Sequence, residues 1–203
     1  SILPTSPLPS ISQQVFIEGY TQSGASVNTL ATGSNAVLRI ELDGESAGLN
    51  VTGLTLSLGG SKVRGLVINQ FKRDSGAGTP TGIGLDVRGS SISVVGNFVG
   101  TDVSGTLDLG NGGSGIVCGS GGSQTIGGTT SGVATPEVAN LISGNDGDGI
   151  TVTSISNIIQ GNWIGTSANG TGPLGNSGSG IGFSGAGFNT VGIDVDPETN
   201  AGE

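Results

Sequence analysis

The side chains in this chain that could do chemistry are mainly carboxylates in closely spaced pairs. Asp146 and Asp148 flank a glycine in the segment Asn-Asp-Gly-Asp-Gly, and Asp194 and Asp196 flank a valine. Carboxylate oxygens in turns are the donors that calcium prefers. These four aspartates are therefore the candidate metal ligands, and calcium is the candidate cofactor. Neither segment shows the further ligands of a complete calcium loop, so we expect these acids to be solvated turn residues and expect no cofactor, with calcium as the alternative.

Polysaccharide cleavage needs an acid and a base in a defined geometry. The chain has no histidine, and its six basic residues all lie before residue 89. A third acidic pair, Asp102 and Asp108, is replaced by Ser167 and Pro173 where the sequence repeats itself. We therefore expect no catalytic residue and no enzymatic activity. A carbohydrate-binding or polysaccharide-cleaving protein is the alternative.

The charge distribution argues against two classes of partner. The formal net charge is −9, and the residues after position 88 include nine carboxylates and no cation. Such a surface repels phosphate and anionic lipid, so we expect neither nucleic acid nor membrane surfaces as partners. No stretch approaches the roughly 20 apolar residues of a membrane span. The asymmetry between the two halves is compatible with head-to-tail contact between copies, but acidity that maintains solubility is the favoured interpretation.

The composition indicates an ordered chain with a thin core. Forty-two glycines and few aromatic residues cannot fill a thick globular interior, yet the charged fraction is only 10%, unlike that of disordered chains. The single cysteine, Cys118, excludes an internal disulfide, and we expect it to be buried and inert because Phe183 occupies the same place in the repeat. These features together favour a solenoid.

A long internal repeat specifies that solenoid. The segment 96–127 aligns with 161–192 without a gap, at an offset of 65 residues from Gly96 to Gly161. Gly-Asn-Phe-Val-Gly-Thr in the first copy meets Gly-Asn-Trp-Ile-Gly-Thr in the second. Stacked coils bring like residues together at a constant offset, which hairpin topologies do not require. The sequence therefore predicts an all-β fold, a right-handed parallel β-helix whose 65-residue repeat spans two or three coils.

A shorter period within the repeat marks the strands. Gly-Ile followed by alternating apolar residues recurs at Gly82-Ile83, Gly115-Ile116, Gly149-Ile150 and Gly180-Ile181. Alternation places every second side chain on one face of a strand, so these segments predict one interior ladder. Further short strands are expected in the apolar runs 63–68, 94–99, 139–142 and 157–159.

Asparagines recur at the same offset and have a structural interpretation. Asn97 and Asn111 in the first copy correspond to Asn162 and Asn176 in the second. Asparagine tolerates left-handed turns, and its amide can bond to backbone groups or to the asparagine one coil away. We expect these four residues to be structural; a polar catalytic row is the alternative.

The two ends of the sequence predict how the first coil is capped and with which partner the last coil pairs. Residues 1–14 contain Pro4, Pro7 and Pro9, which cannot lie in a central strand, so an extended arm that caps the first coil is expected there. We expect residues 15–203 to form a single β-helix domain. No amphipathic capping helix follows the last repeat, and an open strand edge is a template for pairing. The expected partner is therefore the protein itself, stacked end to end.

Several phrases of the sequence resemble bacterial right-handed β-helix repeat proteins of the pectin-lyase-like superfamily. The resemblance covers most of residues 15–193 and rests on 17–24 (IEGYTQSG), 96–102 (GNFVGTD), 140–145 (NLISGN) and 161–166 (GNWIGT). It implies a secreted or cell-surface protein with a structural or adhesive role, such as a stalk, filament or adhesin, with surface glycans as a further candidate partner. It specifies the fold more strongly than the function, because this superfamily contains both enzymes and inert stalks.

Overall fold

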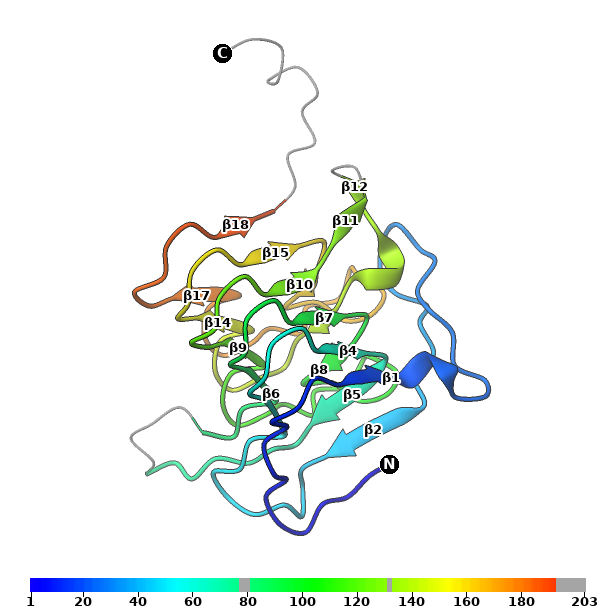
Figure 1. The fold of residues 1–203 in the computed structure, drawn as a ribbon. Coiled ribbons are helices and arrows are strands. Elements are labelled where there is room, and N and C mark those ends of the chain that lie inside the picture. The colour runs from blue at the N-terminus through cyan, green and yellow to red at the C-terminus, as the bar shows by residue number, and fades with distance from the viewer. Residues whose placement is uncertain (77–80, 131–132, 193–203) are drawn as a thin grey trace.

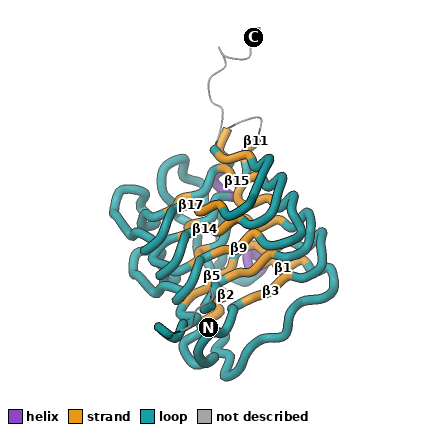
Figure 2. The backbone as a smooth tube through the Cα atoms, turned by 90° about the vertical axis from the view of Figure 1, so that its left-hand side faces the viewer, coloured by secondary structure: helices purple, strands orange, loops and turns teal. Residues whose placement is uncertain are grey.

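Three parallel sheets of short strands run along the length of the molecule (Figure 1). The computed structural model describes residues 1–76, 81–130 and 133–192. One coil is a turn of chain that gives one strand to each sheet, and the coils lie one above another (Figure 2). The structure is therefore a parallel β-helix, the fold that the repeat predicts.

The strands and helices have the following bounds. The first sheet contains β1 (Phe16–Glu18), β4 (Lys62–Arg64), β7 (Ser93–Val95), β10 (Thr125–Gly127), β15 (Ile158–Gln160) and β18 (Thr190–Val191). The second contains β2 (Ile40–Asp43), β5 (Leu66–Asn69), β8 (Phe98–Val99), β13 (Leu141–Ile142) and β16 (Trp163–Ile164). The third contains β3 (Leu54–Leu56), β6 (Leu85–Val87), β9 (Ile116–Cys118), β14 (Ile150–Val152) and β17 (Ile181–Phe183). Outside these sheets lie the antiparallel pair β11 (Thr129–Thr130) and β12 (Val133–Ala134) and the 3-10 helices η1 (Gly19–Thr21) and η2 (Pro136–Val138). Neither helix in the described ranges is long and apolar enough to cross a membrane.

The sequence offset of 65 residues corresponds to two coils. Phe98 in β8 pairs with Leu141 in β13, and Leu141 pairs with Trp163 in β16, so the two aligned aromatic residues lie two coils apart. The coil between them contains the hairpin β11–β12 and η2 before it reaches the second sheet. This insertion makes neighbouring coils unequal in length.

The corner between the first and second sheets depends on glycine. The apolar runs 63–68 and 94–99 each extend over two strands, divided at Gly65 and after Val95. Gly65, Gly96 and Gly161 occupy equivalent corners with φ of 75°, 64° and 64°. A side chain at these left-handed angles is strained, so the glycines of the repeated Gly-Asn phrase set the sharp turn from one sheet to the next.

Stacked apolar side chains fill the interior, but one expected register is wrong. Ile116, Ile150 and Ile181 stack as the Gly-Ile period predicts, whereas Leu85, and not Ile83, is the residue that pairs with Ile116. The preceding loop is longer in that coil, so Gly84, two residues after Gly82, is the equivalent of Gly115. The third sheet therefore has an unbroken interior row, and the other sheets have corresponding ones. The interior rows are Leu54-Leu85-Ile116-Ile150-Ile181, Leu56-Val87-Cys118-Val152-Phe183, Leu42-Ile68-Val99-Ile142-Ile164 and Ile17-Val63-Val94-Ile126-Ile159-Val191.

A second, smaller core lies on the outside of the second sheet. Buried Phe98 and Leu141 belong to it, and partly buried Trp163 packs against it. The segment 19–39, which we call the strap, covers this row; it rises beside the coils as the blue loop in Figure 1. The Tyr20 hydroxyl donates to the carbonyl of Gly96 at 2.7 Å, and the Ser34 amide donates to the carbonyl of Ala168. The strap thus ties the first coil to the later ones, and Trp163 is a packing residue.

Candidate functional site

Residues 1–14 lie across the N-terminal end of the solenoid. Ile2 pairs in parallel with Leu42 of β2, and Ile11 pairs in parallel with Leu56 of β3. Each pair has backbone hydrogen bonds on both sides, of 2.7 and 3.0 Å at Ile2 and 2.9 Å at Ile11. The arm therefore covers the outer edges of the second and third sheets. In the described chain β1 pairs only with β4, so the first sheet keeps its outer edge free at this end.

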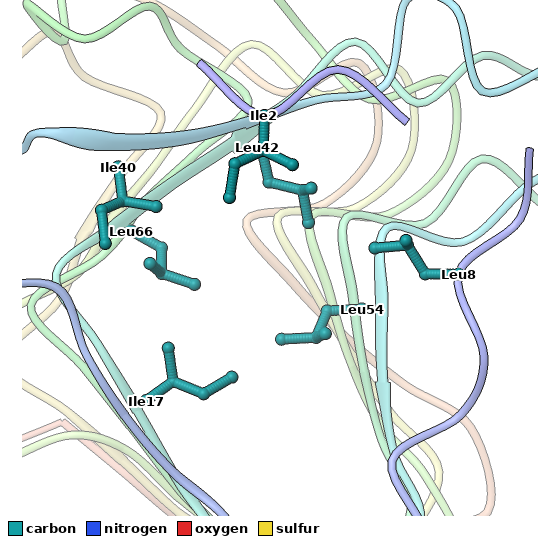
Figure 3. A pocket seen from close by; sticks show the side chains of 7 residues that line it. All are labelled: Ile2, Leu8, Ile17, Ile40, Leu42, Leu54 and Leu66. Atoms are coloured by element: carbon teal, nitrogen blue, oxygen red, sulfur yellow. The ribbon is translucent and has the colours of Figure 1, made fainter. Parts of the chain in front are cut away.

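An apolar cavity of about 270 Å³ opens between the arm and the first coils. Its side chains point inward from the arm and from coils of all three sheets (Figure 3). Leu42, Leu54 and Leu66 are almost fully buried, whereas Ile2 is 54% exposed. The cavity is the end of the apolar interior, which the arm covers only in part. Its lining residues are Ile2, Leu8, Ile17, Ile40, Leu42, Leu54 and Leu66.

The C-terminal end also exposes the interior of the solenoid. Phe183 and Val191 end two interior rows and are 51% and 49% exposed, whereas Val152 and Ile159, one coil below, are at most 2% exposed. A smaller cavity of about 140 Å³ lies between Ile159, Ile164, Ile181 and Val191, among other residues of the last coil. Within the described residues, β16, β17 and β18 each have a partner on one side only. We call this surface the C-terminal face.

The described residues of the C-terminal face include no charged side chain. The sequence from residue 149 to residue 192 contains no Asp, Glu, Lys or Arg. Charged side chains on an exposed strand are a common means of preventing edge-to-edge pairing. An uncharged, partly apolar face with free strand edges is therefore suited to pairing with another strand.

The asparagines singled out in the sequence form two ladders inside the corners. The Asn97 amide donates to Asn140 Oδ1 at 3.1 Å, and the Asn140 amide donates to Asn162 Oδ1 at 2.8 Å. In the second ladder Asn111 donates to Asn145 and Asn145 donates to Asn176, both at 2.9 Å. The same amide groups also donate to the carbonyls of neighbouring strands, such as Val63 and Ile142. The side chains of the repeated asparagines are thus engaged in bonds that hold adjacent coils in register.

Sequence reasoning missed a third ladder at the corner between the third and first sheets. The Asn157 amide donates to Asn189 Oδ1 at 2.8 Å, and Asn157 Oδ1 accepts from the backbone amide of Gln124 at 2.9 Å. Gln124 stands where Asn189 stands one repeat later. This substitution hid the ladder from a search for identical residues.

The aspartates proposed as metal ligands have different surroundings in the structure. Asp148 bonds within the fold, because its Oδ2 accepts from the Thr151 hydroxyl at 2.9 Å and its Oδ1 accepts from the backbone amide of Ser179 at 2.8 Å. Asp194 and Asp196 lie outside the described residues. In the part of the chain that the structure describes, no group of three or more His, Cys, Asp or Glu side chains could hold a metal ion.

Asp146 lies instead beside a basic residue that is remote in sequence. Arg73, Ser75, Gly112 and Asp146 line one polar depression of about 310 Å³ on the surface. The spacing of these residues along the chain does not predict this juxtaposition, because it depends on the stacking of three successive coils. Arg73 and Asp146 are the opposite charges that the fold brings to one depression.

Asp102 holds a loop in shape. Burial acts to raise the pKa of Asp102, but hydrogen bonds from the Leu107, Thr106 and Ser104 amides and the Ser104 hydroxyl outweigh burial and lower the pKa. In the second copy of the repeat, Asn169 Oδ1 accepts corresponding bonds from the Thr171 and Gly172 amides. Hydrogen bonds to Asp102 in the first copy and to Asn169 in the second therefore maintain the same loop conformation, as expected of a structural role.

This lowered pKa predicts a pH dependence. A group with a lowered folded pKa contributes stability above its unfolded pKa, near 3.8, and loses it as the pH falls through the folded value. We expect Asp102→Asn to lower Tm by about 2 °C at pH 7, a small effect because the group is partly exposed to solvent. The difference from the unsubstituted protein should shrink below about pH 4. Thermal melts of both proteins from pH 2 to pH 7 measure this, and a difference that stays constant over that range would contradict the assigned role.

The single thiol, that of Cys118, is buried and stays protonated near neutral pH. Cys118 is fully buried in the interior row between Val87 and Val152. Burial, with a smaller contribution from the charge of Asp86, raises the pKa of the thiol to about 12. Since the thiolate is the reactive form, Cys118 has a packing role.

Comparison with known proteins identified no relative of this chain. The chain matches no protein-family model, no curated protein sequence and no solved structure.

Proposed function

We propose that this chain is a non-catalytic structural module that associates end to end with further copies of itself. The observation that carries the proposal is the exposure of the apolar interior at both ends, at the cavity under the arm and at the uncharged C-terminal face. Burying such faces against one another is favourable, roughly 25 cal/mol per Å² of apolar surface. Contact between two different faces of one chain builds an open linear assembly.

The use of the repeated residues supports a structural role. Among the side chains that persist between the two copies, Ile116 and Ile181 lie in an interior row, and Asn97, Asn111, Asn162 and Asn176 form the asparagine ladders. The acids that change between copies, such as Asp102, serve local turns. The repeated residues thus maintain the stacked coils of the solenoid, and a solenoid of repeating coils is suited to a stalk or filament.

The location of the protein is also a proposal. The phrases of sequence that resemble bacterial right-handed β-helix repeat proteins of the pectin-lyase-like superfamily favour a secreted or cell-surface protein, as part of an adhesin, stalk or extracellular filament. Immunogold labelling of intact cells tests this, and label confined to the cell interior would contradict it.

A charge placed on the C-terminal face tests the association. Val191→Lys puts an ammonium group on that face, and desolvating it on contact is unfavourable. We expect this variant to weaken self-association at least about 10-fold, equivalent to roughly 1.4 kcal/mol. Sedimentation velocity over a concentration series measures the effect.

Ile158→Lys is the matched control. Ile158 is also partly exposed, at 43%, and lies in the first sheet, but its side chain is in the outward row that already contains Lys62. It should associate like the unsubstituted protein. Equal weakening by both lysines, or no association in any of the three proteins, would refute the proposed function.

A carbohydrate-binding protein is the second candidate, favoured by the depression that Arg73 and Asp146 line together. A charged pair beside serine and backbone groups offers donors and acceptors for sugar hydroxyls. A glycan array tests this candidate, and binding that Arg73→Ala leaves unchanged would exclude the depression as the site.

A further inference from the structure

Two phenylalanines at opposite ends of the molecule are the most exposed large apolar side chains in its described part. Phe188 is 90% exposed and Phe16 is 71% exposed. Phe16 begins β1, the first strand of the first sheet, and Phe188 lies two residues before β18, the last strand of the same sheet. Phe16 therefore lies at one end of the first sheet, and Phe188 lies beside its other end.

The backbone at Phe188 is unusual for its residue type. Its φ is +56°, and the equivalent corner residues of the three preceding coils are Ser91, Ser123 and Ser156, with φ of 56°, 55° and 61°. A left-handed conformation is a marked outlier for a bulky residue, and such strain concentrates at functional positions. The last described coil thus replaces a small polar residue by an aromatic ring that the chain itself leaves in solvent.

The first sheet is the one that can continue from copy to copy. The arm covers the outer edge of β2 through Ile2 and that of β3 through Ile11, but it leaves the outer edge of β1 free. At the other end β18 is bonded only to β15 within the described chain. The free edges of β1 and β18 are the complementary edges of a parallel sheet, so one can pair with the other between copies.

Charge does not oppose this contact. The last described coil has no charged side chain. At the N-terminal end, Glu18 in β1 lies 3.6 Å from the guanidinium of Arg64, which balances it. The two edges can approach without burying an unpaired charge.

The register of the sheet specifies which residues would meet. Phe16, Lys62, Ser93, Thr125, Ile158 and Thr190 form one outward row, and Ile17 and Val191 end one inward row. If β18 pairs with β1 of the next copy in this register, Thr190 lies opposite Phe16 and Val191 lies opposite Ile17. Phe188 is then the diagonal neighbour of Phe16, about 7–8 Å away and within reach of an aromatic ring.

We infer that a second copy of this chain docks on β18 through its own β1, and that the ring of Phe188 packs on Phe16 of that copy. The inference rests on the proposed end-to-end association and specifies its joint. Aromatic pairs add to the area they bury, and exposed aromatic anchors commonly dominate the energy of an interface. The exposed ring of Phe188, held on a strained backbone, is buried at this joint.

Serine and threonine substitutions test the two rings without harming the fold. Phe188→Ser restores the residue of the preceding coils, and Phe16→Thr introduces the residue of Thr125 and Thr190 in its row. We expect each to weaken association about 10-fold, with the double variant weaker by less than the product of the single effects because the rings contact each other. Leu107→Ser, at a side chain that is 62% exposed in the loop 102–108, should associate like the unsubstituted protein. Thermal melts should show Phe188→Ser to be at least as stable as the parent.

Cross-linking tests the register independently. Thr190→Cys and Gln14→Cys keep both rings and are diagonal neighbours across the joint, and Cys118 is buried. A mixture of the two variants should give a cross-linked dimer with a short bis-maleimide, whereas Thr190→Cys alone or mixed with Ser93→Cys should give none.

The outcomes separate the inference from the proposed function. If the unsubstituted protein associates and Val191→Lys weakens it, but Phe188→Ser and Phe16→Thr do not, the end-to-end association stands and the β18–β1 joint is wrong. Cross-linking of Thr190→Cys to Ser93→Cys would also overturn the joint. If the unsubstituted protein is monomeric at every concentration, both are overturned.

Discussion

Replacing Asn140 by aspartate is expected to destabilise the fold by at least about 3 kcal/mol at neutral pH. The Asn140 amide donates to the Val94 carbonyl and to Asn162 Oδ1, both at 2.8 Å. A carboxylate at this fully buried position would meet two acceptors and have no proton for either. For a domain whose total stability is on the order of 5–15 kcal/mol, the loss is large.

The pH dependence of the stability of Asn140→Asp shows whether the cost comes from the charge of the carboxylate or from the altered side-chain shape. Burial and the two facing oxygens should raise the folded pKa of the new carboxyl above its unfolded value near 3.9. The penalty is then complete above the folded pKa and is relieved as the pH falls toward about 4, because the protonated acid can donate to one acceptor. Urea unfolding of both proteins between pH 4 and pH 8 measures this difference.

Asn50→Asp is the matched control. Asn50 Oδ1 accepts from the Asp74 amide and from the Thr81 hydroxyl. Aspartate keeps both acceptor bonds, and the side chain is exposed, so we expect a change within about 0.5 kcal/mol. If Asn140→Asp were as mild as this control, the ladder would not hold the coils in register.

The second large effect is expected in the interior row of the third sheet. Ile116 is fully buried between Leu85 and Ile150. Removing three carbons there leaves a cavity between neighbours that the hydrogen-bonded strands prevent from closing. We expect Ile116→Ala to cost about 3–4 kcal/mol, within the range for buried aliphatic residues.

Ile181→Ala removes the same atoms at the end of the same row. Ile181 is only partly buried and lies on Ile150 alone, so the expected cost is about half as large or less. Urea denaturation of the two variants compares them directly. Equal costs would contradict the stacking order of the coils.

The fold was predictable because the repeat is specified by residues with few alternatives. The corner glycines Gly96 and Gly161 need a left-handed backbone, and Asn97 and Asn162 need partners one coil away. Both requirements recur at one offset. The number of coils in the repeat was not predictable, because Asn140 lies 43 residues after Asn97 but only 22 before Asn162. The hairpin β11–β12 accounts for much of this inequality, and it has no counterpart in the next coil.

The strap and the polar depression lie beyond what the sequence could predict. The segment 19–39 has no repeat, and its contact with Ala168 joins residues that no periodicity relates. Arg73 and Asp146 line one depression although they lie 73 residues apart in the sequence. The Ile83 register failed because the loop before β6 shifts the equivalent glycine to Gly84. Local patterns predict strands and corners, whereas the lateral packing of loops depends on the assembled coils.

The candidate site was predictable in part. The uncharged segment 149–192 is visible in the sequence. The choice of the first sheet as the continuous one was not, because it depends on Ile2 and Ile11 covering the other two. The strain at Phe188 likewise appears only when the coils are aligned and its φ is compared with those of the serines.

Small-angle X-ray scattering of the unsubstituted protein over a concentration series tests the central claim most directly. End-to-end stacking predicts that the maximum dimension grows with concentration while the cross-sectional radius of gyration stays that of a single solenoid. Growth of the cross-section would show side-by-side association, and a single particle size at all concentrations would show none. Either of these results would contradict the account.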